Sequence, residues 1–289
     1  MCLLAIAMGV SDRWPLVIAS NRDEYRDRPT LPLAVWSTPG EVTVVSGRDL
    51  LAGGTWMGST TGGRIALLTN VREPDATAAA LSRGDLPLRW LEGQMNAAQF
   101  LADTNPTSYG GCNLLMGDFL RGEWTWASNR ANVGAVPLNS QQTTSGWQTM
   151  ALSPGIYGLS NALLDTPWPK TQALKAAMAG ALAKADADGD TAVLANILWP
   201  ALGNTERAAL HDLPTTGVAT ALEQALSSAL IDMPERGYGT RCSTLMWIAA
   251  EPNSNSFSAT ICEKSMTAES PKPSASDAQM VRLTWSMPV

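Results

Sequence analysis

The chain begins MCLLAIAMGVSDRWPLVIASNRDE, residues 1–24, and this stretch decides how we interpret the fold. Residues 3–8 (LLAIAM) are apolar throughout, residues 15–20 (PLVIAS) are nearly so, and GVSDRW between them has the composition of a turn. The pattern predicts an antiparallel hairpin whose turn centres near Ser11 and Asp12. The numbers of paired residues should then sum to about 23 to 25.

Cys2 is the residue of this hairpin that could carry chemistry. Removal of Met1, which is common before a small second residue, would leave Cys2 with a free α-amine beside its thiol. The two groups have pKa values of roughly 8 and 8.5, so a proton can pass between them near neutral pH. A nucleophile and its base would then share one residue, which is the principle of N-terminal-nucleophile catalysis. A cysteine at position 2 with no role remains the alternative.

The charged tetrapeptide that follows the second apolar run should lie beside this thiol, because the hairpin places Cys2 opposite one of residues 21–23. The guanidinium of Arg22 would stabilise a thiolate and lower the pKa of Cys2. A carboxylate from Asp23 or Glu24 could orient the α-ammonium group or a substrate nitrogen. In the other interpretation NRDEYRDRPTLP is only a charged, solvated loop at a strand end.

Three asparagines and one arginine occur at strand ends where a hydrolase needs neutral donors and charges. Asn70 ends RIALLTN, Asn161 ends IYGLSN, and Asn113 begins NLLMG. A side-chain N–H directed at an oxyanion is worth roughly 3 kcal/mol, although asparagine at a strand end also forms Asx turns. Arg241 opens a buried-looking strand, and Asp23 or Glu24 is its expected partner unless it forms an ordinary structural ion pair.

The remainder of the chain alternates between groups of strands and groups of helices, which predicts an α+β fold. Strands are expected at residues 42–46, 55–59, 64–70, 113–117, 123–128, 156–160, 243–249, 257–263 and 280–285. Helices are expected as two short segments within 77–102, one after Asp165-Thr166-Pro167, one capped by Asp190, and one near 219–231.

Composition excludes several classes of function. A net charge of −6 with no basic stripe argues against nucleic-acid binding, and no apolar run reaches the roughly 18 residues of a membrane span. Four widely spaced cysteines indicate a reduced, cytoplasmic protein. A single histidine, His211, argues against a His-based metal site, and we expect neither metal nor cofactor.

Eleven tryptophans are unusual for a chain of this length. They either fill the core or line a pocket for a flat or apolar ligand, and the candidates for the pocket include Trp56, Trp124, Trp126 and Trp168.

Several blocks in order, MCLL, NRDE, GTW, LTNVREP, NLLMGD and LSNALLDTPWPK, together resemble the NRDE family, which includes transport and Golgi organisation protein 2. The resemblance implies one domain over residues 1–289 with an Ntn-hydrolase-type fold, a four-layer αββα sandwich of two mainly antiparallel sheets. It also implies an association with heme mobilisation and with lipid or acyl-CoA metabolism.

A more distant similarity connects the chain with the choloylglycine hydrolase group, which includes bile salt hydrolases and penicillin V acylases. This similarity implies catalytic roles for Cys2, Arg22, Asp23, Asn70, Asn161 and Arg241. The group spaces its arginine and aspartate three residues apart, whereas they are adjacent here. Whether Asp23 or Glu24 faces the thiol is therefore open.

Two functions follow as hypotheses. The first is an Ntn-type cysteine amidohydrolase or acyltransferase that acts on a non-peptide C–N amide of a small or lipid-like metabolite, with Glu24, Trp56, Asn113 and Trp168 contacting the substrate. The second is a non-catalytic carrier of a hydrophobic metabolite such as heme or acyl-CoA. In a heme carrier, His211, Cys2 or a methionine would have to bind the iron.

Overall fold

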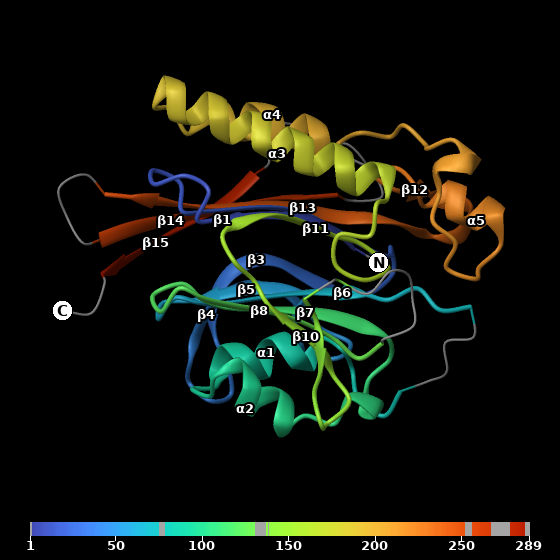
Figure 1. The fold of residues 1–289 in the computed structure, drawn as a ribbon, viewed down its shortest axis with the longest axis horizontal. Helices are drawn as coiled ribbons and strands as arrows, with labels where there is room; N and C mark the ends of the chain where they lie inside the picture. The colour runs from blue at the N-terminus through green and yellow to red at the C-terminus, as the bar shows by residue number, and fades with distance from the viewer. Residues whose placement is uncertain are drawn as a thin grey trace.

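The structure is a computed structural model that describes residues 2–74, 79–130, 137, 139–251, 256–266 and 278–286. Two antiparallel sheets lie one upon the other, and helices cover both outer faces (Figure 1).

The first sheet has the strand order β11-β1-β2-β13-β14-β15, and the short β12 pairs with β13. Its strands are β1 (Cys2–Met8), β2 (Leu16–Tyr25), β11 (Gly155–Leu159), β12 (Asp232–Met233), β13 (Tyr238–Ala250), β14 (Ser256–Ser265) and β15 (Ala278–Ser286). Strands β1 and β2 lie side by side near its centre, so both faces of the N-terminal hairpin are covered.

The predicted hairpin register is confirmed. Cys2 pairs with Arg22 and Met8 with Leu16, so paired numbers sum to 24 throughout. Gly9 begins the turn with a φ of +59°, a conformation that suits glycine, and its N–H donates to the carbonyl of Pro15 at 2.9 Å.

The second sheet has the order β3-β4-β5-β6-β7-β8-β10-β9. Its strands are β3 (Thr30–Ser37), β4 (Thr43–Asp49), β5 (Met57–Thr60), β6 (Arg64–Asn70), β7 (Cys112–Asp118), β8 (Glu123–Ser128), β9 (Gln141–Gln142) and β10 (Gln148–Ala151).

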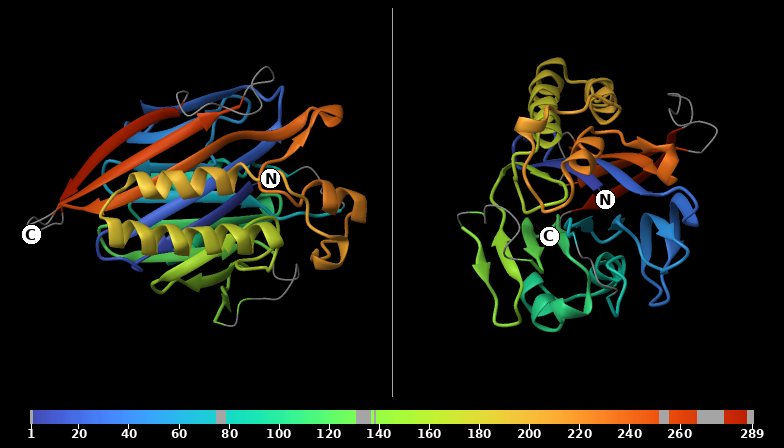
Figure 2. Two further views of the ribbon diagram at one scale, coloured as in Figure 1. Left: turned by 90° about the horizontal axis from the view of Figure 1, so that it is seen from above. Right: turned by 90° about the vertical axis from the view of Figure 1, so that its right-hand side faces the viewer.

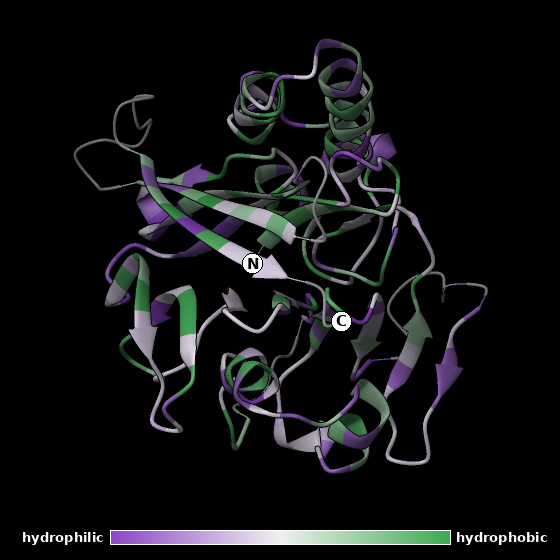
Figure 3. Ribbon diagram, turned by 90° about the vertical axis from the view of Figure 1, so that its left-hand side faces the viewer, coloured by the Kyte–Doolittle hydropathy of each residue, from purple (hydrophilic) through white to green (hydrophobic). Residues whose placement is uncertain are grey.

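The helices complete a four-layer αββα sandwich, as Figures 2 and 3 show from other directions. They are α1 (Asp85–Glu92), α2 (Ala97–Ala102), α3 (Pro169–Asp188), α4 (Ala192–Leu202) and α5 (Thr220–Ala225), with 3₁₀ turns η1 (Pro106–Ser108), η2 (Leu210–Asp212) and η3 (Pro234–Arg236). Helices α3 and α4 cover the first sheet, and α1 and α2 cover the second. The expected architecture is therefore confirmed.

The alternation of side chains along β2 decides which layer each residue reaches. Leu16 and Ile18 pack between the two sheets, whereas Val17 and Ala19 pack against α3 and α4. By the same alternation, Cys2 and Arg22 belong to the space between the sheets, and Asp23 belongs to the helical side. None of the described helices is both long and apolar enough to cross a membrane.

The expectation of a charged loop after Ser20 was wrong. Strand β2 continues to Tyr25, and β3 begins at Thr30. Strands β1 and β13 flank this part of β2 and satisfy its backbone. Asn21 is fully buried, and its side-chain amide is satisfied because it donates to the carbonyls of Leu202 and Ala229, both at 2.9 Å.

The helix expected near residues 219–231 is shorter than predicted, because α5 ends at Ala225. The hydroxyls of Ser227 and Ser228 then bond to nearby carbonyls at 2.7 and 2.8 Å, an alternative to helical hydrogen bonding that serine offers the backbone. The predicted start of the fourth helix is close to the observed one, since Asp190 accepts the N–H of Ala192 at 2.8 Å.

Candidate active site

A small cavity of about 100 Å³ opens at the end of the N-terminal hairpin. Its lining is mostly polar and comes from β1, β2, β4, β6 and the loops beside them. It comprises Cys2, Arg22, Asp23, Glu24, Arg28, Asp49, Thr55, Trp56, Leu68, Asn70, Ser82, Arg83 and Gly84. Six of the ten predicted site residues therefore meet here: Cys2, Arg22, Asp23, Glu24, Trp56 and Asn70.

Burial raises the pKa of the Cys2 thiol above its ordinary value. The charge of Asp23 raises it further, whereas Arg22 and a hydrogen bond from the Asp23 backbone lower it. Arg22 thus acts in the predicted direction, but desolvation is the larger effect. The net result corrects our expectation of a lowered pKa for this thiol. The expected removal of Met1 concerns a residue outside the described part of the chain and stays a prediction.

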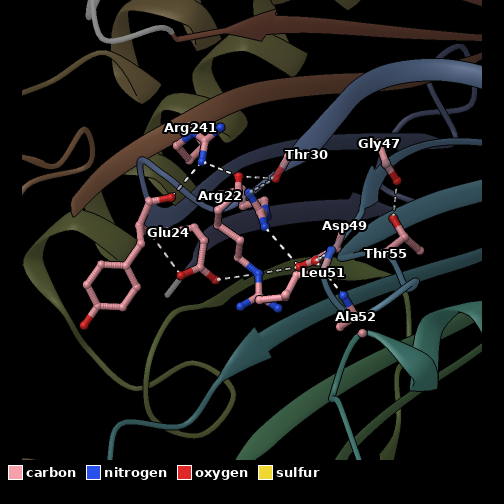
Figure 4. A network of polar contacts seen from close by, with 12 residues as sticks. Arg22, Glu24, Thr30, Gly47, Asp49, Leu51, Ala52, Thr55 and Arg241 are labelled. Carbon is pink, nitrogen blue, oxygen red and sulfur yellow. Dashed lines mark hydrogen bonds and ion pairs between the residues drawn. The ribbon is translucent and has the colours of Figure 1, made fainter. Parts of the chain in front are cut away.

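Arg22 lies between Cys2 on β1 and Cys242 on β13, since both pair with it in the sheet. Its guanidinium carbon is 4.2 Å from the centre of the Trp56 ring, a cation–π contact. Its other contacts are long: 3.4 Å to the Thr30 hydroxyl and 3.5 Å to Asp49 Oδ2 (Figure 4). Arg22 is therefore buried but loosely held.

The two carboxylates of the tetrapeptide have different surroundings. Asp23 is 2% exposed and accepts the Thr240 hydroxyl at 2.7 Å, and its charge acts on the Cys2 thiol. Burial raises the pKa of Asp23, and the charge of Lys170 opposes this effect. Glu24 accepts the N–H of Tyr25 at 2.9 Å and lies 3.9 Å from Arg28. Both carboxylates line the cavity, and the charge of Asp23 is the one that acts on the Cys2 thiol.

Lys170 is a site residue that sequence reasoning missed. It is 6% exposed, and its ammonium donates to the carbonyl of Leu226 at 2.8 Å. Burial lowers its pKa to about 8, although the charges of Asp23 and Cys2 favour the ammonium form. The lysine ends the block LSNALLDTPWPK in the first turn of α3, and nothing local in the sequence indicates that it is buried.

Arg72 and Glu223 form a second charged pair that the sequence did not indicate. They make a buried ion pair, and Glu223 also accepts the hydroxyl and N–H of Thr216. Arg72 donates to Asn161 Oδ1 at 3.2 Å, and its guanidinium carbon lies 5.2 Å from the centre of the Trp168 ring. Its charge also acts on Asp23.

Asn70 and Asn161 are brought together but differ in position. Asn70 lines the cavity, whereas Asn161 is fully buried behind it and does not. The side-chain amide of Asn161 donates to the backbone carbonyl of Asn70 at 3.1 Å. The backbone carbonyl of Asn161 accepts the backbone N–H of Arg72 at 2.8 Å. Ser160 links this segment to the carbonyl of Cys2 at 3.1 Å. Asn161 therefore positions residues 70–72.

Like Asn161, the predicted residues Asn113, Trp168 and Arg241 lie outside this cavity. Asn113 is fully buried, and its amide bonds to Thr69, Ala162 and Trp126 at 2.8–3.2 Å, which joins neighbouring strands. Trp168 is 1% exposed and packs beside Arg72. The geometry thus favours structural roles for both residues rather than contact with a substrate.

Arg241 does not have the partner that we expected. Among the described residues, its guanidinium donates to the backbone carbonyls of Tyr25 and Arg28 at 2.7 and 3.0 Å instead of to Asp23 or Glu24. Because Asp23 extends to the opposite side of β2 and Glu24 lies near Arg28, the turn between β2 and β3 offers it carbonyl groups instead.

Metal ligands do not gather in the described part of the chain, where no three His, Cys, Asp or Glu side chains are placed to hold an ion. His211 lies 84% exposed in the η2 turn, 3.5 Å from Asp212. All four cysteines are buried free thiols.

Known proteins with similar sequences place the chain in a family. The sequence model described as Transport and Golgi organisation 2 matches residues 1–268. The Transport and Golgi organization protein 2 homologs of Homo sapiens and Bos taurus are each 30% identical, over 243 and 263 residues. The human match covers 82% of this chain and 83% of that protein, and the bovine match 89% and 88%.

Among solved structures, a Caenorhabditis elegans N-acylethanolamine-hydrolyzing acid amidase ortholog is similar with a TM-score of 0.47 and 11% identity, over 99% of this chain and 100% of that one. The length and identity of the sequence matches decide the assignment: this chain belongs to the Transport and Golgi organisation 2 family.

Proposed function

We propose that this protein is a cysteine hydrolase or acyltransferase of the Ntn type that acts on C–N amide bonds other than peptide bonds, with Cys2 as its nucleophile once Met1 is removed. One observation carries the proposal: a thiol, a guanidinium, a carboxylate and a neutral amide (Cys2, Arg22, Asp23 and Asn70) line the same cavity. Burial and charge shift the pKa values of Cys2 and Asp23, as is common for catalytic groups.

In the proposed reaction the α-amine of Cys2 takes the thiol proton, and the sulfur attacks the amide carbon. The carbonyl oxygen becomes an oxyanion, to which the side-chain amide of Asn70 donates. The α-ammonium, held by Asp23, then returns a proton to the departing nitrogen as the C–N bond breaks. Water or another acceptor releases the acyl group from the sulfur, and its proton passes to the α-amine.

Neighbouring residues prepare these groups for the reaction. Asn161 holds the backbone carbonyl of Asn70 and is itself bonded by Arg72, and Lys170 provides a positive charge near Asp23. Arg22 opposes the effect of burial on the Cys2 thiol. The oxyanion role that the sequence suggested for Asn161 thus becomes a positioning role.

Cavity size separates this proposal from the carrier alternative. Pockets that enclose drug-sized ligands measure about 300–1,000 Å³, whereas the cavity at Cys2 measures about 100 Å³. It can receive an amide group but not a whole heme. His211, the one histidine, is largely exposed. A heme carrier that uses the cavity at Cys2 therefore has less support than the hydrolase, whereas a carrier of acyl-CoA stays the alternative.

The test measures hydrolysis of fluorogenic N-acyl aminocoumarin amides by wild-type, Cys2→Ala and Cys112→Ala proteins, with intact-mass analysis. We expect a mature mass without Met1, a transient acyl adduct on the Cys2 peptide, and turnover that Cys2→Ala abolishes and Cys112→Ala retains. Turnover that survives Cys2→Ala, or a mature chain that keeps Met1, would reject the mechanism. A Soret shift on heme titration that is lost in His211→Ala would favour the carrier.

A further inference from the structure

A second cavity of about 260 Å³ lies next to the first, between β3 and the strands β13 and β14. Leu31, Pro32, Trp56 and Met266 give it an apolar wall. It is larger than the cavity at Cys2, and the proposed reaction makes no use of it.

Arg22 and Trp56 line both cavities. In the sheet, Cys2, Arg22 and Cys242 form one row across β1, β2 and β13, so their side chains point to the same side. Cys2 lines the first cavity and Cys242 lines the second. The Arg22 side chain, stacked on Trp56, is thus the divider between the two spaces.

The guanidinium of Arg22, which divides the two cavities, is only weakly held by its hydrogen bonds. The hydrogen bonds of Arg22 to Thr30 and Asp49 measure 3.4 and 3.5 Å, whereas strong bonds of this type are near 2.9 Å. Arg28 already holds the same Asp49 oxygen at 2.6 Å. A rotation of Arg22 would give up two long hydrogen bonds and the contact with Trp56, and it would join the two cavities. The joined space reaches the range of about 300–1,000 Å³ that is usual for ligand pockets.

We infer that the second cavity is a subsite of the Cys2 site that receives the apolar group attached to the carbonyl carbon of the substrate. This inference rests on the proposed function. The leaving amine is the polar half of the substrate, and the first cavity is the more polar of the two, since charged side chains of both signs line it, among them Glu24, Asp49 and Arg28. The acyl group, which stays on the sulfur, then has the apolar space beyond Arg22. The substrate class is an amide with a polar amine half and a hydrocarbon acyl half.

The polar residues of the second cavity suit an uncharged occupant, because their hydrogen bonds are already made within the protein. Glu263 accepts the N–H of Leu33 at 2.8 Å and the hydroxyl of Thr244 at 3.2 Å. Burial raises its pKa, which favours the neutral carboxyl form. Arg241 directs its guanidinium to the carbonyls of Tyr25 and Arg28. The cavity therefore offers a ligand apolar contact rather than a new charge.

The test measures binding of octanamide and acetamide to full-length Cys2→Ala protein by titration calorimetry, so that no reaction is needed. We expect octanamide to bind at least about ten-fold more tightly, because its longer chain buries more apolar surface. Leu31→Trp, added to Cys2→Ala, should fill the cavity from its 47% exposed edge and remove this preference. Val35→Trp changes a similarly exposed residue of β3 that lines neither cavity, and should keep the preference.

Ser265→Phe fills the cavity from β14 and serves as the second variant, with Ser37→Phe on β3 as its control. Equal affinity for both amides, or a preference that survives Leu31→Trp and Ser265→Phe, would overturn the subsite. Chain-length-dependent binding without turnover by the Cys2 protein would reject the hydrolase alone. Turnover without any chain-length dependence would reject the subsite alone.

Discussion

Arg22 and Arg72 are both buried arginines whose charges act on the Cys2–Asp23 pair, yet the structure holds them in opposite ways. Arg22 lies between the sheets, has two hydrogen bonds of 3.4 and 3.5 Å, and forms the wall of two cavities. Arg72 has a buried ion pair with Glu223, a hydrogen bond to Asn161 and the ring of Trp168 beside it.

This difference in how the two arginines are held indicates that Arg72 has a structural role, whereas Arg22 affects the reactivity of Cys2. A buried charge with a dedicated counter-charge is costly to disturb, because removal of one partner leaves the other unpaired in a medium of low polarity. Arg72 therefore fixes the backbone behind Asn70. Arg22 shares Asp49 with Arg28, so its loss leaves that carboxylate paired. We expect substitutions around Arg72 to change stability and substitutions at Arg22 to change reactivity.

The largest effect is expected for Glu223→Ala, which removes the carboxylate of the buried ion pair with Arg72. Loss of one partner of a buried pair costs roughly 3–5 kcal/mol, and urea unfolding monitored by tryptophan fluorescence would measure it. Glu235→Ala, an exposed acid in the η3 turn, is the control and should have little effect. A cost below about 1 kcal/mol, typical of surface pairs, would show that Arg72 is not held as described.

Lys170 should make the free energy of unfolding depend on pH in the alkaline range. Its pKa is about 8 in the folded chain against an ordinary value of 10.5, so the folded state binds fewer protons than the unfolded state between these values. Stability from this group therefore rises with pH across this window, by about 3 kcal/mol in total.

The difference in unfolding free energy between wild type and Lys170→Met, measured from pH 7 to 10.5, should show this rise. Lys184→Met, an exposed position on the same helix, should not. A flat difference for Lys170→Met would mean that the lysine has an ordinary environment.

Arg22→Met should slow alkylation of Cys2 by iodoacetamide at pH 8 by about three- to ten-fold, because loss of the cation raises the pKa of the thiol further. The rate would be followed by mass spectrometry of the Cys2 peptide, and it should recover as pH rises. Stability should change by less than about 1 kcal/mol, since Arg28 keeps Asp49 paired. A large loss of stability with an unchanged labelling rate would reverse the roles of the two arginines.

The smallest effect is expected for Arg26→Ala, which breaks a short ion pair of 2.6 Å with Asp232. Both side chains are partly exposed, at 21% and 46%, so water replaces the lost contact. Thermal unfolding should show a loss of about 1 kcal/mol or less. A cost comparable with that of Glu223→Ala would mean that burial is not what distinguishes the two pairs.

The sequence by itself determined the hairpin and its register, because the apolar runs and the turn between them are local and the pairing follows by counting. It therefore brought Arg22 beside Cys2, and most other strands were found within a few residues of their bounds. The prediction of a solvated loop after Ser20 failed, because the charged composition of this segment suggests exposure to solvent, whereas the neighbouring strand buries most of it.

Only the tertiary structure decided which polar groups support the site. Arg72 and Glu223 are 151 positions apart, and Asn161 and Asn70 are 91 apart. Lys170 is buried where the segment after α5 folds over it, and the backbone carbonyl of Leu226 accepts a hydrogen bond from its ammonium group. Burial and charge pairing arise when separate layers meet, so no local pattern encodes them. For this reason the pairing of Cys2 with Arg22 could be predicted from the first 24 residues, whereas the buried charges around them could not.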